Sequence, residues 1–247
     1  MNNINRCPVC GGIHISIRKD GNYLCESCDT SFEKSFFETK STEAVYKNAV
    51  GSILAIDAIS GDTETCGTGI VIDKNGHILT SAHIITGDTD SHSSIKNLSD
   101  IIIAHRSSGD EGFKTDVVYM DKELDLALLY SPDAKRLGTI RISDKRPVSG
   151  QRICVIGNSK GEGLCVVDGI VSDALRRVNG RELVLISAPV TNGYSGGPVM
   201  DMDGSLVGLV TGGRDDAAAM NYAVPGKVVR DFLIIAKKQS KKANLGI

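Results

Sequence analysis

Short apolar runs separated by turn residues recur along most of the chain, from about residue 50 to residue 225. Gly, Asn, Asp and Pro lie between these runs, as is typical of short β-strands joined by tight turns. The predicted strands are Ser52–Ala58, Gly69–Ile72, His77–Thr80, Ile101–His105, Lys114–Met120, Leu126–Tyr130, Gln151–Ile156, Leu164–Ser172, Glu182–Ser187, Pro198–Met200, Ser205–Thr211 and Met220–Ala223. A dozen short strands predict an all-β fold.

The last apolar pattern has a helical period. Within Pro225–Lys238, apolar residues recur at positions 228, 229, 232, 233 and 236. This spacing predicts an amphipathic helix, and cations in its last turn favour the same interpretation. Residues 239–247 follow as a basic tail.

Residues 1–30 carry two Cys-x-x-Cys pairs. Four thiolates in two such knuckles can form a tetrahedral cage, so the pattern is typical of a zinc ribbon. Its one structural Zn²⁺ would be held by Cys7, Cys10, Cys25 and Cys28. Two disulfides or redox-active dithiols are the alternatives, although without a secretory signal disulfides are disfavoured. Residues 31–46, a polar segment with three phenylalanines, are predicted to be a linker that partly docks or begins helical.

The ribbon has two interpretations beyond metal binding. It is either a stable small domain and nothing more, or a docking site for a regulatory protein or a nucleic acid. The sequence leaves both open.

One serine lies in a segment suited to nucleophilic attack. In Thr191–Pro198, Ser195 follows Gly193-Tyr194 and precedes two glycines. Small neighbours let the backbone turn its amides toward a developing oxyanion, so the amides of Gly193 and Ser195 form the candidate oxyanion hole. The segment indicates a serine hydrolase.

Such a serine needs a base and an acid that orients this base. A strand at Gly69–Asp73, a turn at Lys74–Gly76 and a second strand ending at His83 predict a hairpin that delivers His83 as the base. Asp125 lies at the start of the next suitable apolar run, as a buried carboxylate holding imidazole Nδ1–H would. The chain order of the candidates is therefore His, Asp, Ser.

Four segments, in this order, resemble the HtrA/Deg branch of the chymotrypsin-fold serine proteases. They are the hairpin Gly67–His83, the strand Asp125–Leu129, the hairpin Ile153–Ser172 and the nucleophile segment Ser195–Val210. The resemblance covers roughly residues 50–235. It implies two six-stranded β-barrels with a C-terminal helix, in a protease domain at residues 47–238. It also implies peptide-bond hydrolysis by a His83–Asp125–Ser195 triad through an acyl-enzyme.

The resemblance assigns a substrate pocket as well. Its residues are Pro189, Thr191, Asn192, Thr211, Gly212 and Gly213. No acid occupies position 189, so the pocket is expected to take a small or medium aliphatic side chain rather than Lys or Arg. Tyr194 departs from the family pattern and implies no zymogen cleavage. It either packs beneath the oxyanion loop or holds an inactive loop until a partner binds.

No PDZ domain follows the predicted helix, so capture of substrates by a PDZ domain is not expected for this chain. The alternative function is a catalytically silent or latent protease-fold scaffold, with the ribbon as its interaction module.

Composition narrows the partners. Lys and Arg number 28 against 30 Asp and Glu, a formal charge of -2, so no global field favours nucleic acid or a membrane surface. Because no secretory leader or membrane-length apolar run is recognisable, we expect a cytoplasmic protein without a membrane partner. The expected substrate is a protein or peptide, and catalysis is expected to need no cofactor. The oligomeric state stays open.

Overall fold

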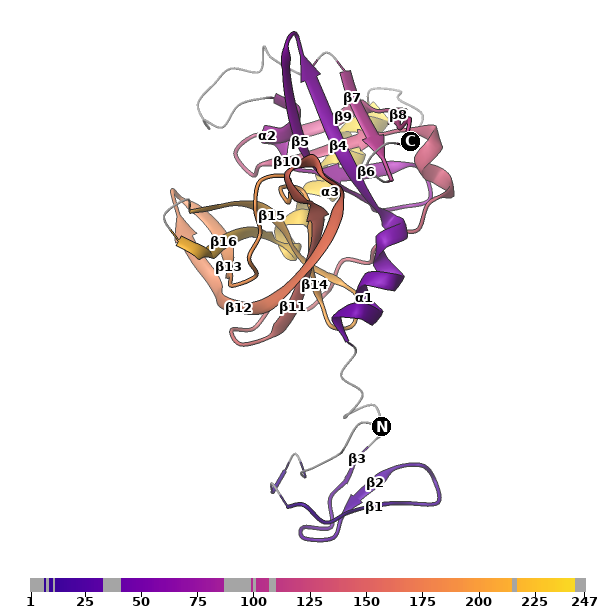
Figure 1. Cartoon of the computed structure of the whole chain (residues 1–247), viewed down its shortest axis with the longest axis vertical. Helices are drawn as coiled ribbons and strands as arrows, with labels where there is room; N and C mark the ends of the chain where they lie inside the picture. Colours follow the sequence, from indigo (N-terminus) through magenta and orange to yellow (C-terminus); the bar gives the residue numbers. More distant parts are fainter. Residues whose placement is uncertain are drawn as a thin grey trace. The chain divides into compact units, whose positions relative to one another are not determined.

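The computed structural model describes residues 7, 9–10, 12–32, 41–86, 99, 101–106, 110–214 and 217–242. The chain forms two compact units, Met1–Ser41 and Thr42–Ile247 (Figure 1). Within the described ranges, none of the helices is both long enough and apolar enough to cross a membrane.

The first unit is a three-stranded antiparallel sheet in the order β1-β2-β3. Its strands are β1 (Ile15–Ile17), β2 (Tyr23–Cys25) and β3 (Ser31–Phe32). Among the described residues of this unit, only Cys7 and Cys25 are buried apolar residues. A unit this small cannot bury a sufficient core and typically depends on a metal or disulfides. The third strand extends the ribbon beyond residue 30, its predicted end.

The segment 31–46 contains the beginning of a helix, as the prediction allowed. Its first two residues belong to β3, and its last residues begin helix α1 (Thr42–Ala49). Helix α1 belongs to the second unit, where Val45 and Ala49 join the main hydrophobic cluster. The sequence looked polar here because few side chains of this short helix face inward. Residues 33–40 lie outside the described residues.

The second unit contains a seven-stranded sheet in the order β8-β7-β4-β5-β6-β10-β9. Every pairing in it is antiparallel. Its strands are β4 (Ile53–Ser60), β5 (Thr63–Val71), β6 (His77–Thr80), β7 (Ile101–His105), β8 (Phe113–Lys114), β9 (Asp116–Asp121) and β10 (Leu126–Tyr130).

The two edge strands of this sheet, β8 and β9, are consecutive in the chain, and only Thr115 separates them. The backbone N–H and the hydroxyl of Thr115 both donate to the Ile102 carbonyl, at 2.9 and 3.3 Å. The predicted strand Lys114–Met120 is therefore a bent strand in two parts, which pairs with β7 on one side and β10 on the other. The sheet curves as the wall of a barrel does. Six strands were predicted for the first barrel, and this bend divides one of them, so the sheet has seven.

The second sheet is a closed barrel in the order β11-β12-β13-β16-β15-β14. Its strands are β11 (Arg152–Asn158), β12 (Leu164–Val178), β13 (Arg181–Ile186), β14 (Pro198–Asp201), β15 (Leu206–Arg214) and β16 (Ala217–Pro225). The long, curved β12 is visible in Figure 1. It runs past the predicted end at Ser172, because its polar outer part pairs with β13 up to Val178. An apolar-run pattern does not detect such a polar extension.

Helix α3 (Gly226–Lys242) closes the second unit. Phe232 and Ala236 lie in a hydrophobic cluster to which strands of both sheets contribute. The helix continues past Lys238 into the predicted tail, because the residues that follow include no helix breaker. Residues 243–247 lie outside the described residues. The all-β class, with two barrel-type sheets and a C-terminal helix, is thus confirmed.

Candidate active site and metal centre

His83 lies in helix α2 (Ala82–Thr86), a short turn that follows β6. The prediction that a strand would run to His83 is wrong, because β6 ends at Thr80. The apolar side chains of α2 pack into the hydrophobic cluster of the first sheet. In a continuing strand, successive side chains would point to opposite faces instead. His83 is the one α2 residue that is not buried, with 26% of its side chain exposed.

Asp125 follows the turn between β9 and β10 and has a positive φ of 56°. Aspartate is one of the few residues other than glycine that adopt this left-handed conformation readily. The Leu124 N–H donates to Asp121 Oδ1 at 2.9 Å, which closes the turn. From the β12–β13 hairpin, Arg181 Nη2 donates to the Leu124 carbonyl at 2.8 Å. These contacts hold Asp125, which is only 7% exposed. Nothing in the sequence indicated the contact of Arg181 with Leu124.

The Asp125 carboxylate accepts hydrogen bonds from His83 and Thr211. His83 Nδ1 lies 2.9 and 3.0 Å from its two oxygens, and the His83 backbone N–H donates to Oδ1 at 3.0 Å. The Thr211 hydroxyl donates to Oδ2. Burial by itself raises the pKa of Asp125, but the hydrogen bonds from His83 and Thr211 and the charge of His83 outweigh it and lower that pKa. An ionised Asp125 keeps the proton on Nδ1 and leaves Nε2 as an acceptor.

Ser195 lies on the loop before β14, with one left-handed glycine two residues before it and another directly after it. The φ angles are 93° for Gly193 and 82° for Gly196. A Cβ on Gly193 would overlap the Asn158 carbonyl oxygen, and one on Gly196 would overlap that of Thr68. Both positions therefore require glycine. Ser195 itself is half-buried.

The Val210 carbonyl joins the serine loop to the histidine helix. It accepts the Gly196 N–H at 2.8 Å and the Ser81 hydroxyl at 3.1 Å. Gly196 is adjacent to the candidate nucleophile, and Ser81 lies just before α2. The next residue of β15 is the threonine that binds the candidate acid. The structure thus brings the three predicted catalytic segments together around one point of β15.

The peptide groups around Ser195 are oriented through their carbonyl oxygens. The carbonyl before Gly193 accepts the Lys160 N–H at 2.8 Å, and the carbonyl before Ser195 accepts the Gly197 N–H at 2.8 Å. No described peptide bond is cis, so the amides of Gly193 and Ser195 point away from these carbonyls. Within the described part of the chain neither amide donates a hydrogen bond. Both are available to an oxyanion.

Tyr194 packs beneath this loop. It is 2% exposed and belongs to the hydrophobic cluster of the second barrel. A Cβ on Gly157 would lie 2.6 Å from its ring. Burial raises the pKa of the Tyr194 phenol, so the side chain stays neutral.

The predicted pocket residues lie on two segments. Pro189, Thr191 and Asn192 are on the loop after β13, and Thr211, Gly212 and Gly213 are on β15. Asn221 of β16, which the sequence reasoning missed, connects the two segments. Its Nδ2 donates to the Ala188 carbonyl at 2.8 Å, and its Oδ1 takes the space of a Cβ on Gly213. The Thr211 hydroxyl binds Asp125, so this residue supports the candidate acid.

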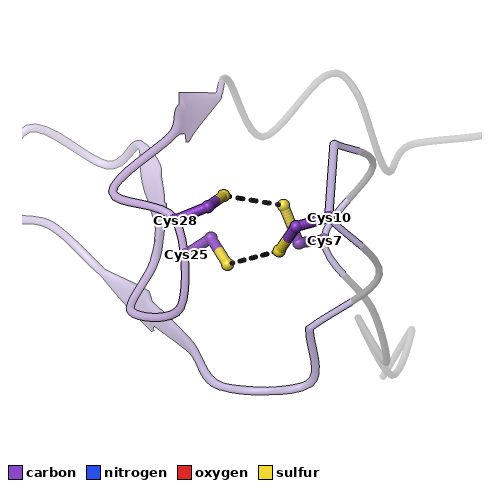
Figure 2. A group of neighbouring side chains, drawn as sticks. All are labelled: Cys7, Cys10, Cys25 and Cys28. Carbon is purple, nitrogen blue, oxygen red and sulfur yellow. Dashed lines mark hydrogen bonds between the residues drawn. The ribbon is translucent and has the colours of Figure 1, made fainter.

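Four cysteine sulfurs converge in the ribbon (Figure 2). The sulfurs of Cys7 and Cys28 are 3.7 Å apart, those of Cys10 and Cys25 are 3.6 Å apart, and all four lie within 4.8 Å of one another. These separations exceed the ~2.05 Å of a disulfide bond. They are close to the edge of about 3.8 Å of a tetrahedron with metal–sulfur bonds of about 2.3 Å. The four sulfurs could therefore hold one metal ion.

Two barrel-type sheets that bring a His–Asp pair to a glycine-bounded serine loop define the chymotrypsin-like class of proteins. Residues 67–209 match the trypsin-like peptidase domain, and the chain belongs to this family.

Two curated relatives extend this result. The chain is 27% identical over 195 residues to the periplasmic serine endoprotease DegP of Escherichia coli K12, covering 73% of this chain and 38% of that protein. It is 29% identical over 179 residues to serine protease HTRA1 of Xenopus tropicalis, covering 68% and 35% respectively. The chain thus spans little more than a third of the length of these relatives.

Solved structures show the same fold. The chain is similar to the serine endoprotease from Yersinia pestis, with a TM-score of 0.65 at 23% identity, covering 82% of this chain and 68% of that one. The predicted resemblance to the HtrA/Deg branch is confirmed.

Proposed function

We propose that the protein is a serine endopeptidase. The observation that carries this proposal is the pair of His83 and Asp125, in which the buried carboxylate binds Nδ1 and leaves Nε2 to accept a proton. The serine loop joins the same point of β15 as the histidine helix does. The names of the relatives, one a serine endoprotease and the other a serine protease, support the same activity.

In the proposed reaction, His83 Nε2 removes the proton of Ser195 Oγ while Oγ bonds to the substrate carbonyl carbon. The amides of Gly193 and Ser195 donate to the oxyanion, and Asp125 stabilises the imidazolium. The C–N bond then breaks, His83 gives the proton to the leaving amine, and an acyl-enzyme remains. Water, deprotonated by His83, releases the acid and restores Ser195.

Cleavage of a mixed peptide library tests this proposal. With Pro189 in place of an acid, we expect new termini after small or medium aliphatic residues, and few after Lys or Arg. Mass spectrometry of a proteome-derived library, before and after incubation, would reveal the new termini. A library that stays intact, while the protein remains folded, would contradict the proposal.

The cysteines suggest where the protein works. None of the seven, which include Cys66, Cys154 and Cys165, is in a disulfide bond. Free thiols persist in reducing compartments. We therefore propose that the protein is cytoplasmic, which a fractionation of its native cells would check.

We also propose that the ribbon holds Zn²⁺ as a structural ion. A site of four thiolates with tetrahedral spacing is the typical structural zinc site, and it supplies folding free energy to a unit without a core. The exposed apolar side chains Val9, Ile13 and Ile17, at 68%, 62% and 70% exposure, offer a contact surface to a regulatory protein. Regulation through the ribbon is part of this proposal.

Cys25→Ser should abolish zinc binding and unfold the ribbon, because Cys25 is fully buried and one of four ligands. The matched control is Cys165→Ser, since Cys165 is exposed and outside the ribbon. Elemental analysis should find about one zinc per chain in the wild type and the control, and little in Cys25→Ser. Zinc retained by Cys25→Ser would contradict the assignment. Peptidase activity that is unchanged in Cys25→Ser, with and without cell extract, would leave the ribbon a purely structural role.

A further inference from the structure

Thr68 is the point at which the first barrel contacts the serine loop. It lies on β5 between two glycines, and it is 0% exposed. The strand comes from the first sheet, whereas the loop belongs to the second. A buried hydroxyl normally needs one or two partners, which are most often backbone groups nearby in the chain.

The partners of Thr68 are instead far apart in the sequence. Its hydroxyl donates to the Gly193 carbonyl at 2.7 Å, across 125 residues, and accepts the Asn158 N–H at 2.9 Å, across 90 residues. Its backbone N–H donates to the Ser195 carbonyl at 2.8 Å. Its carbonyl accepts the Thr80 hydroxyl at 2.7 Å. Every hydrogen-bonding group of Thr68 is therefore used.

These contacts fix the serine loop on both sides of the nucleophile. The carbonyls of Gly193 and Ser195 flank the peptide group that carries the Ser195 amide. Because Thr68 binds both carbonyls, it restrains the backbone on either side of that amide. Gly193 has a positive φ and no side chain, so its conformation depends on such outside contacts.

The same hydroxyl also contacts the end of β11, at Asn158. The Asn158 carbonyl lies where a Cβ on Gly193 would be, so Asn158 and Gly193 are packed against each other. The hydroxyl of Thr68 binds one backbone group of each residue. Threonine suits this task because its β-branch restricts χ1 and holds the hydroxyl in one orientation.

The glycine before Thr68 connects the same strand to the base. A Cβ on Gly67 would lie 2.7 Å from Cγ1 of Ile84, the residue after His83. The Gly67-Thr68 segment therefore contacts both the histidine helix and the serine loop.

We propose that Thr68 is a positioning residue for the oxyanion hole. Through its hydrogen bonds, Thr68 fixes the serine loop, and with it the amides of Gly193 and Ser195, relative to the first barrel. The inference rests on the proposed function of this site. Thr68 does not touch the substrate and acts through the loop. Its hydroxyl should therefore matter to transition-state binding, and much less to substrate binding.

The test compares Thr68→Val, which keeps the shape and removes the hydroxyl, with Thr68→Ser, which keeps the hydroxyl. Removal of one oxyanion donor typically lowers kcat by about 10²- to 10³-fold. We expect Thr68→Val to lower kcat by about 10²-fold, with KM within about threefold of the wild type. Thr68→Ser should stay within about tenfold. The affinity for a peptide boronic acid, which mimics the tetrahedral intermediate, should fall in parallel with kcat/KM.

Kinetics are measured at a temperature at which near-UV circular dichroism shows each variant folded. A folded Thr68→Val with kcat within about threefold of the wild type would overturn the inference, as would an equal loss in Thr68→Ser. If Thr68→Val does not fold, Thr68→Ser decides alone. Its kcat within about tenfold and unchanged KM support the proposal, and a loss of about 10²-fold overturns it. An inactive wild type would instead refute the proposed function itself.

Discussion

Ser195→Ala should lower kcat for peptide hydrolysis by about 10⁶-fold, the loss seen when a serine protease loses its nucleophile. The change removes the only atom proposed to bond with the substrate carbon. Binding should survive, because the amides of the serine loop are backbone groups and remain in place. KM should therefore change much less than kcat. The measurement is turnover of the best peptide from the library by the wild type and the variant.

Stability provides the control for this loss. Ser195 is half-buried on a loop, so removal of its hydroxyl should change the free energy of unfolding by no more than about 1 kcal/mol. A folded Ser195→Ala variant that retains more than about a hundredth of the wild-type kcat would exclude Ser195 as the nucleophile.

Asp125→Asn should lower kcat by about 10⁴-fold. Asp125 accepts bonds from the Nδ1 and backbone N–H of His83 and from Thr211. An amide has one acceptor oxygen instead of two, so it cannot serve these donors equally and favours the wrong tautomer of His83. Glu123→Gln is the matched control, because Glu123 is an exposed carboxylate two residues away. This control should retain the wild-type kcat.

The pH dependence of stability tests the same carboxylate. The pKa of Asp125 is lowered from its ordinary value of 3.8, so the fold favours the ionised form. That contribution is present above the ordinary pKa and is lost as the pH falls through the lowered one. The stability advantage of the wild type over Asp125→Asn should be constant from pH 7 to about 5 and shrink below about 4. Urea unfolding at each pH measures it. An advantage that persists undiminished at pH 2 would contradict the role of Asp125.

The sequence was sufficient to predict elements whose pattern lies within a few neighbouring residues. Apolar runs predicted β7 and β10 at their observed bounds, since these strands are short and bounded by turn residues. The helical period predicted the buried face of α3. The pairing of His83 with Asp125 was predicted from chain order and context, and the structure places the two in contact.

The sequence was insufficient where contacts between residues far apart in the chain determine the local structure. In the sequence, the segment around Thr115 looks like one uninterrupted strand. Only the hydrogen bonds of Thr115 to the distant Ile102 carbonyl reveal the bend. Thr211 was interpreted as a pocket wall, and its bond to Asp125 spans 86 residues. Thr68 lies just before the predicted strand Gly69–Ile72 and received no predicted role, since nothing in its neighbours indicates contacts across the chain.

Labelling with a fluorophosphonate probe tests the central claim most directly, because the reaction requires an activated serine and no knowledge of the substrate. The zinc-loaded wild type should form one adduct, which peptide mass spectrometry should locate on Ser195. Ser195→Ala should remain unlabelled. A folded, metal-loaded wild type that forms no adduct would contradict the account, and would favour a silent or latent scaffold with the protease fold.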